Sequence, residues 1–258
     1  MADPVALRKG PDTDISDAER DVRVTLAGCY RAVDMIGWSE LIFNHITARV
    51  PGPDRHFLIN PYGLWYDEVT ASNLVKVDLA GNIIGASEWG INPAGYVIHS
   101  AVHEAVEDAR CVIHIHTTAG MAISCLDEGL RTETIYDAVI DGEVAYHDFE
   151  GVTLYEEEKP RLVASLGDKR MMILRNHGLL TVGRSIPEAF MYMWRLNRAC
   201  EIQMAAHGTG GTVRAVTDAA ITASKGAYDG LRDGDRHAEK VFAAMLRRVE
   251  KADPGYKD

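Results

Sequence analysis

The sequence predicts an α/β domain in which helices cover the faces of a mixed or antiparallel sheet. Strand-like segments, apolar and rich in β-branched residues, alternate along the chain with segments of helical spacing. Several strand-like segments follow one another through short turns, which favours antiparallel pairing. The 258 residues contain no internal repeat and no low-complexity linker. We therefore expect a single domain over residues 14–258, preceded by a flexible polar arm over residues 1–13.

The first half of the chain begins with a helix and continues into strands. Ser16 and Glu19 form a capping box, and Gly37 ends the helix that they begin. The strand-like segments that follow are separated by turn residues and are 42–50, 56–60 and a hairpin made of 73–79 and 83–84. Asn92, as an N-cap, and Pro93, in the first turn, then start a second helix.

The second half interleaves strands and helices. The predicted strands are 111–117, 144–149, 171–174 and 179–182. The predicted helices are 119–126, 156–167, 185–208 and 236–250, the last followed by a short C-terminal tail. Ser185 and Glu188 form a second capping box at the start of the longest helix. The Gly- and Thr-rich segment 208–216 is expected to be mobile.

Composition and charge exclude several classes of function. The net charge of −11 argues against nucleic acid or an anionic membrane as a partner, because both would repel the chain. No apolar run approaches the roughly 18 residues of a membrane-spanning helix, and the polar N-terminus contains no signal peptide. The cysteines lie singly within apolar segments and have no CxxC spacing: they are Cys29, Cys111, Cys125 and Cys200. We expect reduced, buried thiols in a cytoplasmic protein, and no cysteine-ligated metal.

His114 and His116 stand out within the predicted strand 111–117. Residues i and i+2 of a strand point to the same face, so the two imidazoles leave this buried strand side by side. They need partners, because burying an unpaired polar group costs a few kcal/mol. Either they are two of three ligands of a metal ion, or they are hydrogen-bonded to each other and to neighbours in the core. The motif is too short to decide between these explanations.

A third histidine, His177, lies in an Asn-His-Gly turn between the last two predicted strands. Gly178 permits a sharp backbone path there that can aim the imidazole inward. Three histidines would leave an open position for water or substrate, as catalytic zinc sites do, although spacing alone leaves both explanations open. His99 and His103 share a helix face at i and i+4, and we expect them to lie around the site or at the surface rather than to bind metal.

Several longer motifs carry a family resemblance. They are Val112-Ile-His-Ile-His-Thr, Leu174-Arg-Asn-His-Gly, and Ala199-Cys-Glu-Ile-Gln in the longest helix. On these motifs the chain from Val22 to about Gln203 resembles the class II aldolase/adducin family. It is most similar to the adducin head and its bacterial relatives, through stretches that begin at Asn44, Leu58, Asn92 and Gly142.

This resemblance implies a fold, an assembly and a cofactor. The implied fold is a three-layer α/β/α arrangement with a central mixed, mainly antiparallel sheet. The implied assembly is a ring-shaped homotetramer with active sites between subunits. The implied cofactor is a divalent metal held by His114, His116 and His177, with zinc expected first and manganese or iron as alternatives.

The chain departs from the sugar-phosphate aldolases of this family at the positions that carry their reaction. Aligned on the His-x-His strand, the catalytic Glu of fuculose-phosphate aldolase falls on Gly95. The phosphate-binding turns and serines of that enzyme fall on Asn44-His45, Tyr62-Gly63 and Pro93-Ala94. A phosphate site needs small residues, free backbone N–H groups and hydroxyls, whereas Tyr62 fills space, Pro93 has no N–H and Ala94 has no hydroxyl. The resemblance therefore does not extend to an ordinary sugar-phosphate aldolase.

The motifs leave the catalytic residues open. The candidates are His45, Tyr62, Glu88, Arg175 and Tyr256. His45 and Tyr62 would either line the former phosphate pocket and bind a carboxylate or phenol, or pack at a strand end. Glu88 would replace the missing carboxylate or be a solvated loop acid, and Arg175 would form a salt bridge beside the histidine turn. Tyr256 would close over a neighbouring active site.

Three hypotheses about function follow. The first is a metal-dependent lyase that cleaves or decarboxylates a small, non-phosphorylated oxo- or hydroxy-acid, because a metal held by three neutral histidines keeps its charge and polarises substrate oxygens. The second is a non-haem iron oxygenase on the same scaffold, since histidine sites do not select one metal. The third is a non-catalytic, adducin-like assembly module. The long neck and basic tail of adducins are absent from the sequence, which favours an enzyme.

Overall fold

A seven-stranded sheet runs through the centre of the computed structural model, which describes residues 15–152, 156–231 and 236–258. The strand order is β3-β2-β1-β4-β7-β6-β5. The strands are β1 (His45–Arg49), β2 (Phe57–Ile59), β3 (Val75–Val77), β4 (Cys111–Ile115), β5 (Val144–His147), β6 (Met171–Leu174) and β7 (Gly178–Gly183). Neighbouring strands are antiparallel except for the parallel pair β5–β6. The prediction of a mixed, mainly antiparallel sheet is confirmed, while the predicted arm 1–13 lies outside the described residues.

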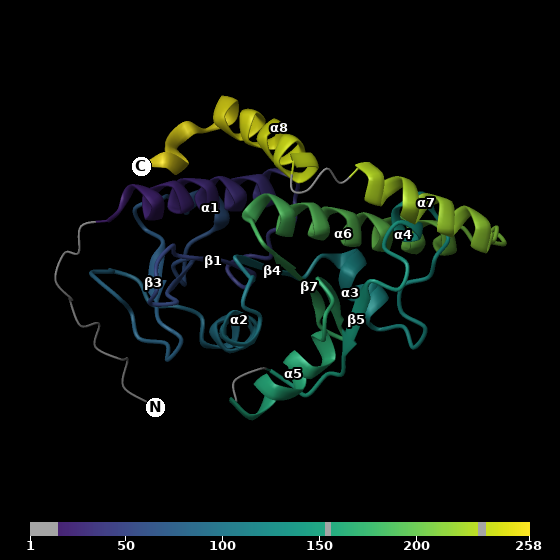
Figure 1. Ribbon diagram of the computed structural model, residues 1–258, viewed down its shortest axis with the longest axis horizontal. Helices are drawn as coiled ribbons and strands as arrows, with labels where there is room; N and C mark the ends of the chain where they lie inside the picture. The colour runs from purple at the N-terminus through teal and green to yellow at the C-terminus, as the bar shows by residue number, and fades with distance from the viewer. Residues whose placement is uncertain (1–14, 153–155, 232–235) are drawn as a thin grey trace.

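Helices cover both faces of this sheet and complete three layers (Figure 1). The helices are α1 (Asp17–Met35), α2 (Pro93–Ala105), α3 (Thr118–Ser124), α4 (Ile135–Ala138), α5 (Lys159–Leu166), α6 (Ile186–Gly208), α7 (Asp218–Leu231) and α8 (Arg236–Ala252). Helices α1 and α6 pack on one face and carry α8 on their outer side, whereas α2 and α5 pack on the opposite face. Across the described ranges, no helix combines the length and apolarity that crossing a membrane would require.

The predicted helix starts are confirmed by their capping hydrogen bonds. The Ser16 side chain accepts a hydrogen bond from the Glu19 N–H at 3.2 Å, and Ser185 accepts one from Glu188 at the same distance. Asn92 Oδ1 accepts the Ala94 N–H at 3.1 Å. These caps satisfy backbone donors that the first helical turn leaves unpaired. They therefore fix where α1, α2 and α6 enter the layers.

The main core lies between the sheet and the α1–α6 layer. Its largest fully buried members include Leu26, Tyr30, Ile46, Leu58 and Ile113. Each such aliphatic side chain contributes about 1.5–3 kcal/mol by leaving water. A smaller core, which includes Ile98, Val112, Leu162, Met172 and Leu180, lies under α2 and α5. The sheet is therefore buried on both faces at its centre, where β4 lies.

Some elements differ from the sequence-based expectation. Helices α4 and α7 were not expected, because α4 is short and α7 is built mainly from Ala, Ser, Thr and Gly without a stripe of large apolar residues. The high helix propensity of alanine explains α7 better than burial does. The predicted hairpin after residue 73 is reduced to β3 and one bridge between Val77 and Ile83. Cys125 is exposed, unlike the other cysteines, because it follows the end of α3.

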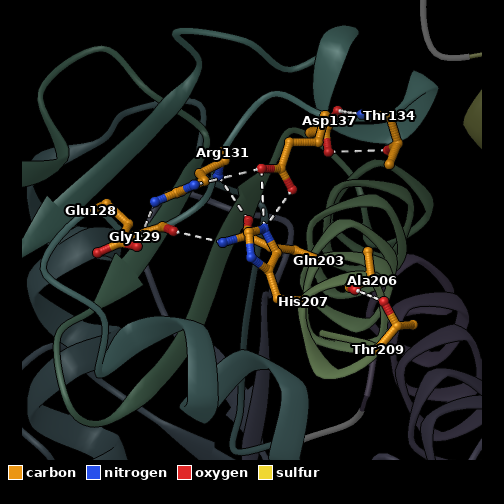
Figure 2. A network of polar contacts seen from close by, with 10 residues as sticks. Glu128, Gly129, Arg131, Thr134, Asp137, Gln203, Ala206, His207 and Thr209 are labelled. Atoms are coloured by element: carbon orange, nitrogen blue, oxygen red, sulfur yellow. Dashed lines mark hydrogen bonds and ion pairs between the residues drawn. The ribbon is translucent and has the colours of Figure 1, made fainter. Parts of the chain in front are cut away.

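Figure 2 shows how the segment after α3 is held against the C-terminal half of α6. Gln203 Nε2 donates to the Gly129 carbonyl at 3.0 Å, and Gln203 Oε1 accepts the Arg131 N–H at 2.8 Å. His207 Nε2 lies 2.9 Å from a Glu133 carboxylate oxygen. Gln203 is 2 % exposed, so its amide replaces water for two backbone groups. The final Gln of the Cys-Glu-Ile-Gln motif is therefore a structural residue.

Candidate metal centre

The sheet order brings three histidines to one point. Strands β4 and β7 are antiparallel, and Ile115 at the end of β4 pairs with Leu179 at the start of β7. His116 follows the first of these strands and His177 precedes the second, so both lie at the same edge as His114. The ring centroids of these three histidines are 4.6–4.9 Å apart. Their candidate ligand atoms lie within 4.8 Å of one another, a grouping that no other His, Cys, Asp or Glu side chains make in the described residues.

The turn that carries His177 is built differently from the sequence-based explanation. Asn176, not Gly178, adopts the left-handed conformation, with φ of 53°. A Cβ on Gly178 would lie 2.6 Å from the Ile115 carbonyl oxygen and 3.0 Å from the His116 ring. Gly178 is therefore required for the close approach of β7 to β4, and the sharp path comes from asparagine, which tolerates this region well.

Hydrogen bonding fixes the tautomer of His114. Its Nδ1 lies 2.9 Å from the Leu179 carbonyl oxygen. Because a carbonyl only accepts, the ring proton is on Nδ1, and the Nε2 lone pair faces His116 Nε2 at 2.8 Å. Backbone carbonyls orient metal-ligating histidines in this way. The His114 Nε2 lone pair is thus directed toward the centre of the cluster, where it could bind a metal ion.

The cluster is neutral at pH 7. Burial, reinforced by the neighbouring imidazoles, lowers the pKa of His114 well below its usual range. Burial also lowers the pKa of His116, and burial with the adjacent His116 lowers the pKa of His177 to about 4. Neutral imidazoles are the form that binds metal ions. The donor chemistry of the three residues therefore fits a divalent metal.

An open cavity of about 570 Å³ lies over the histidines. The residues that line it are Glu40, Phe43, His45, Tyr62, Asn92, Ala94, Ile98, His114, His116, Met121, Phe149, Gly151, Val152, Asn176 and His177. None of these described lining residues is a lysine or an arginine. Phe43, Tyr62 and Phe149 are 44 %, 41 % and 53 % exposed, so their rings are available to a ligand. The cavity is apolar and aromatic at its walls and polar at the histidine cluster.

His45 occupies the space that a side chain on Gly95 would need. A Cβ on Gly95 would lie 2.4–2.5 Å from three ring atoms of His45. His45 is paired with His114 across β1 and β4, and the two rings stack with centroids 5.8 Å apart. Asn92 Oδ1 is used by its own helix cap, so its Nδ2 faces His45 Nε2 at 3.1 Å and donates to it. The His45 proton is therefore on Nδ1, a buried atom with no hydrogen-bond partner among the described residues.

Two further buried histidines, His99 and His103 of α2, lie beyond the His45 ring on the side away from the cavity. Thr47 Oγ1 is 2.7 Å from His99 Nδ1 and 2.8 Å from His103 Nε2, and His103 Nδ1 is 3.3 Å from the Ala109 carbonyl. Both histidines are fully buried, which excludes a surface position and leaves the other expected position, around the site, since the His99 ring centroid lies 5.6 Å from that of His45. They connect β1 to α2 and do not line the cavity.

Acidification is expected to destabilise the protein through these histidines. Burial together with Arg49 and Arg55 lowers the pKa of His103 to about 3. Unfolding restores a pKa near 6.5, so the unfolded chain binds more protons as the pH falls from 6.5 toward 3. At pH 5 this residue alone should lower the free energy of unfolding by about 2 kcal/mol relative to pH 7.5. Urea unfolding at the two pH values measures the difference.

The His103→Gln variant supplies the control for this pH dependence. It should be less stable than the parent at pH 7.5, because the Thr47 hydroxyl loses one of its two ring partners. It should also lose less stability between pH 7.5 and pH 5, because one titrating group is gone. An equal loss in both proteins would contradict the assignment.

The remaining candidates are distributed over different parts of the fold. Tyr62 lines the cavity, whereas Glu88 is exposed and does not line it. Among the described residues, the carboxylate that lines the cavity is that of Glu40, which no sequence motif predicts. The Arg175 guanidinium lies 4.3 Å from the Tyr146 ring centroid and bonds the Leu126 carbonyl. Within the described ranges it forms no ion pair, so the expected salt bridge is replaced there by this ring contact and hydrogen bond.

Tyr256 lies away from the cavity and packs within its own chain. It is 3 % exposed, and a Cβ on Gly28 of α1 would lie 3.1 Å from its ring. Its hydroxyl lies 3.2 Å from the Glu250 carboxylate. The expected role of closing over a neighbouring active site does not agree with this position, because the ring fills the space between α1 and α8.

Comparisons with known proteins agree with this fold. The family model of the class II aldolase and adducin N-terminal domain matches residues 24–204. A Caulobacter vibrioides protein that is provisionally named a class 2 aldolase is 44% identical over 249 residues, which are 95% of each chain. Alpha-adducin of Rattus norvegicus is 49% identical over 208 residues, 79% of this chain and 28% of that protein.

Two solved structures extend the comparison. The aldolase II superfamily protein from Pseudomonas syringae superposes with a TM-score of 0.88 and 43% identity, covering 95% of this chain and 98% of that one. The L-fuculose 1-phosphate aldolase from Glaciozyma antarctica superposes with a TM-score of 0.83 and 26% identity, covering 98% of both chains. The chain therefore belongs to the class II aldolase and adducin family.

Proposed function

We propose that this protein is a divalent-metal-dependent lyase that cleaves or decarboxylates a small, non-phosphorylated oxo- or hydroxy-acid. The observation that carries the proposal is the neutral histidine cluster at the base of an open cavity, with the His114 lone pair directed toward His116. His114, His116 and His177 would hold the metal. Three imidazole ligands and an open position favour zinc, with manganese or iron as alternatives.

The residues around the proposed metal have different roles. A bound metal would supply Lewis-acid polarisation of a substrate oxygen. The Leu179 carbonyl keeps the His114 proton on Nδ1, and Asn92 keeps the His45 proton on Nδ1 while holding that ring beside His114. Phe43 and Phe149 line the wall of the cavity and would contact the carbon part of a bound substrate.

The charge of the cavity supports a substrate without a phosphate group. Glu40 is an acid, and no lysine or arginine lines the cavity within the described residues. A phosphate dianion would therefore meet no side-chain counter-charge apart from the metal. A single carboxylate chelating the metal would be neutralised there, and Tyr62 and Phe149 would pack on an apolar or aromatic substituent.

Metal analysis tests the proposal directly. Protein purified without added metal, or reconstituted with zinc, manganese or iron, should hold about one metal ion per chain. Less than about a tenth of an ion per chain after reconstitution would exclude both metal-dependent activities. Zinc or manganese would support the lyase. Bound iron with consumption of dioxygen would instead support a non-haem iron oxygenase.

The match to alpha-adducin favours a second candidate, a non-catalytic assembly module. At 49% identity over 208 residues, it covers 79% of this chain. In both candidates we propose a homotetramer, with sites between subunits, located in the cytoplasm. A metal-free tetramer would support the assembly module, whereas a tetramer with stoichiometric metal would support the enzyme.

A further inference from the structure

A second cavity, of about 340 Å³, lies at the opposite end of the β6–β7 hairpin from the histidine turn. Arg170 immediately precedes β6 and Arg184 immediately follows β7, whereas His177 lies in the turn that joins these strands. Six residues of β7 separate the two ends, which is roughly 20 Å at the rise of an extended strand. The two cavities share no lining residue. The second cavity is therefore a separate site.

Arg195 is one of the buried residues that line this cavity. It is 6 % exposed, and its guanidinium carbon lies 3.9 Å from the centroid of the Tyr228 ring. Its Nη1 is buried without a hydrogen-bond partner, and no carboxylate of the described residues lies within ion-pair distance of it. A buried guanidinium without a counter-charge is costly, because desolvation of a charge is repaid only by pairing. The residue therefore needs an anionic partner that the described chain does not supply.

Two further cations on the cavity have unused hydrogen-bonding capacity. Arg170 Nη2 donates to Asp108 at 2.6 Å, but its buried Nη1 has no partner among the described residues. The Lys225 ammonium donates to the Asp141 carbonyl at 2.5 Å, and a backbone carbonyl carries no net charge. Two of the unpartnered buried side-chain atoms of the described residues thus belong to arginines on one cavity. Such convergence is typical of a binding site for an oxyanion.

The acids on this cavity do not neutralise Arg195. Glu188 is engaged by Arg184, whose Nη2 lies 2.8 Å from Glu188 Oε1. Glu143 and Asp229 are exposed at the rim. The cavity therefore holds one buried acid, Glu188, which is paired with Arg184, and its buried cation Arg195 has no carboxylate partner among the described residues.

We propose that this cavity binds a small organic dianion that carries either a phosphate group or two carboxylates. Arg195, Arg170 and Lys225 would bind the charged oxygens, because a guanidinium offers a planar pair of donors that matches either group. Val139, Ile140 and Met171 form an apolar wall that would pack against the carbon part of the ligand. This ligand is distinct from the substrate of the metal centre, whose cavity contains no such cations in the described chain.

Calorimetric titration of the full chain with inorganic phosphate and, separately, with malonate tests the proposal. Binding of at least one of them with a Kd of about 1 mM or tighter is expected. Arg195→Gln should weaken anion binding at least about tenfold, because the buried positive charge is lost while a shorter polar side chain remains. Phosphate alone would identify a phosphorylated ligand, and malonate alone a dicarboxylate.

Arg198→Gln provides the matched control on the same helix. Arg198 is exposed and already paired with Glu201 at 2.8 Å, so its replacement should change the Kd by less than about twofold. Metal content should be the same in all three proteins, which separates this site from the histidine centre. Absence of binding by the parent at about 20 mM of either anion, or equal affinity of the parent and Arg195→Gln, would overturn the proposal. If Arg195→Gln folds poorly, Arg195→Lys replaces it in the test. Because lysine keeps the positive charge, this variant should bind the anion with an affinity between those expected for the parent and for Arg195→Gln.

Discussion

His116→Ala is expected to reduce bound metal to less than about a tenth of an ion per chain and to abolish any lyase activity. The substitution removes one of the three imidazoles whose nitrogens lie within 4.8 Å of one another. His116 lies just beyond the end of β4 and is only partly buried, so the strand pairing of His114 with Leu180 stays intact. Without metal, the free energy of unfolding should change by less than about 1 kcal/mol. Metal analysis, circular dichroism and urea unfolding of one preparation measure all three quantities.

His207→Ala is the matched histidine control. His207 is exposed in the last turn of α6, and its Nε2 lies 2.9 Å from the Glu133 carboxylate, within the network of Figure 2. This variant should keep its full metal content. If His116→Ala instead keeps its metal, the ligand set is wrong. If it fails to fold while His207→Ala folds, the histidine cluster is a structural part of the core.

Gly95→Ala is expected to destabilise the protein by about 2 kcal/mol, although alanine is the better helix former. The new Cβ would meet His45 ring atoms at 2.4–2.5 Å, a separation that real Cβ contacts essentially never show. The ring must then leave its hydrogen bond with Asn92 and its stacking on His114. Activity should fall together with stability, because the displaced ring borders the proposed metal site.

A double-mutant cycle isolates this contact. His45→Ala removes the ring, so the Gly95→Ala substitution made in that background should cost at least about 1 kcal/mol less than in the parent. Gly90→Ala is the control, since nothing lies within 4 Å of a Cβ at that position. A Gly95→Ala protein as stable as the parent would show that His45 does not pack against α2 in the way described here.

The sequence predicts most of the sheet and the helix starts for identifiable physical reasons. Apolar, β-branched segments locate β4, β6 and β7, and side-chain caps such as Ser16 and Ser185 locate helix starts. The same-face rule for residues i and i+2 predicts the proximity of His114 and His116, which the ring distance of 4.6 Å confirms. These features depend on local periodicity, which a single sequence displays directly.

Other features depend on packing between distant segments, and the sequence does not display them. The fit of His45 against Gly95 joins β1 to α2 across 50 positions, and it exists only because these elements pack face to face. The second cavity draws on residues from 139 to 229. Tyr256 enters the core because α8 folds back on α1. In each case the tertiary arrangement, rather than a motif, assigns the role.

The mutual exclusion between the His45 ring and any side chain at position 95 also limits the order in which this site can change during evolution. A protein with a larger residue at position 95 has no room for the ring, and this chain has no room for the larger residue. A direct exchange would pass through a protein in which the two groups collide. A route that avoids this collision instead passes through an intermediate with small residues at both positions 45 and 95. Reversing the exchange requires the same two steps in the opposite order, so neither kind of site is one substitution away from the other.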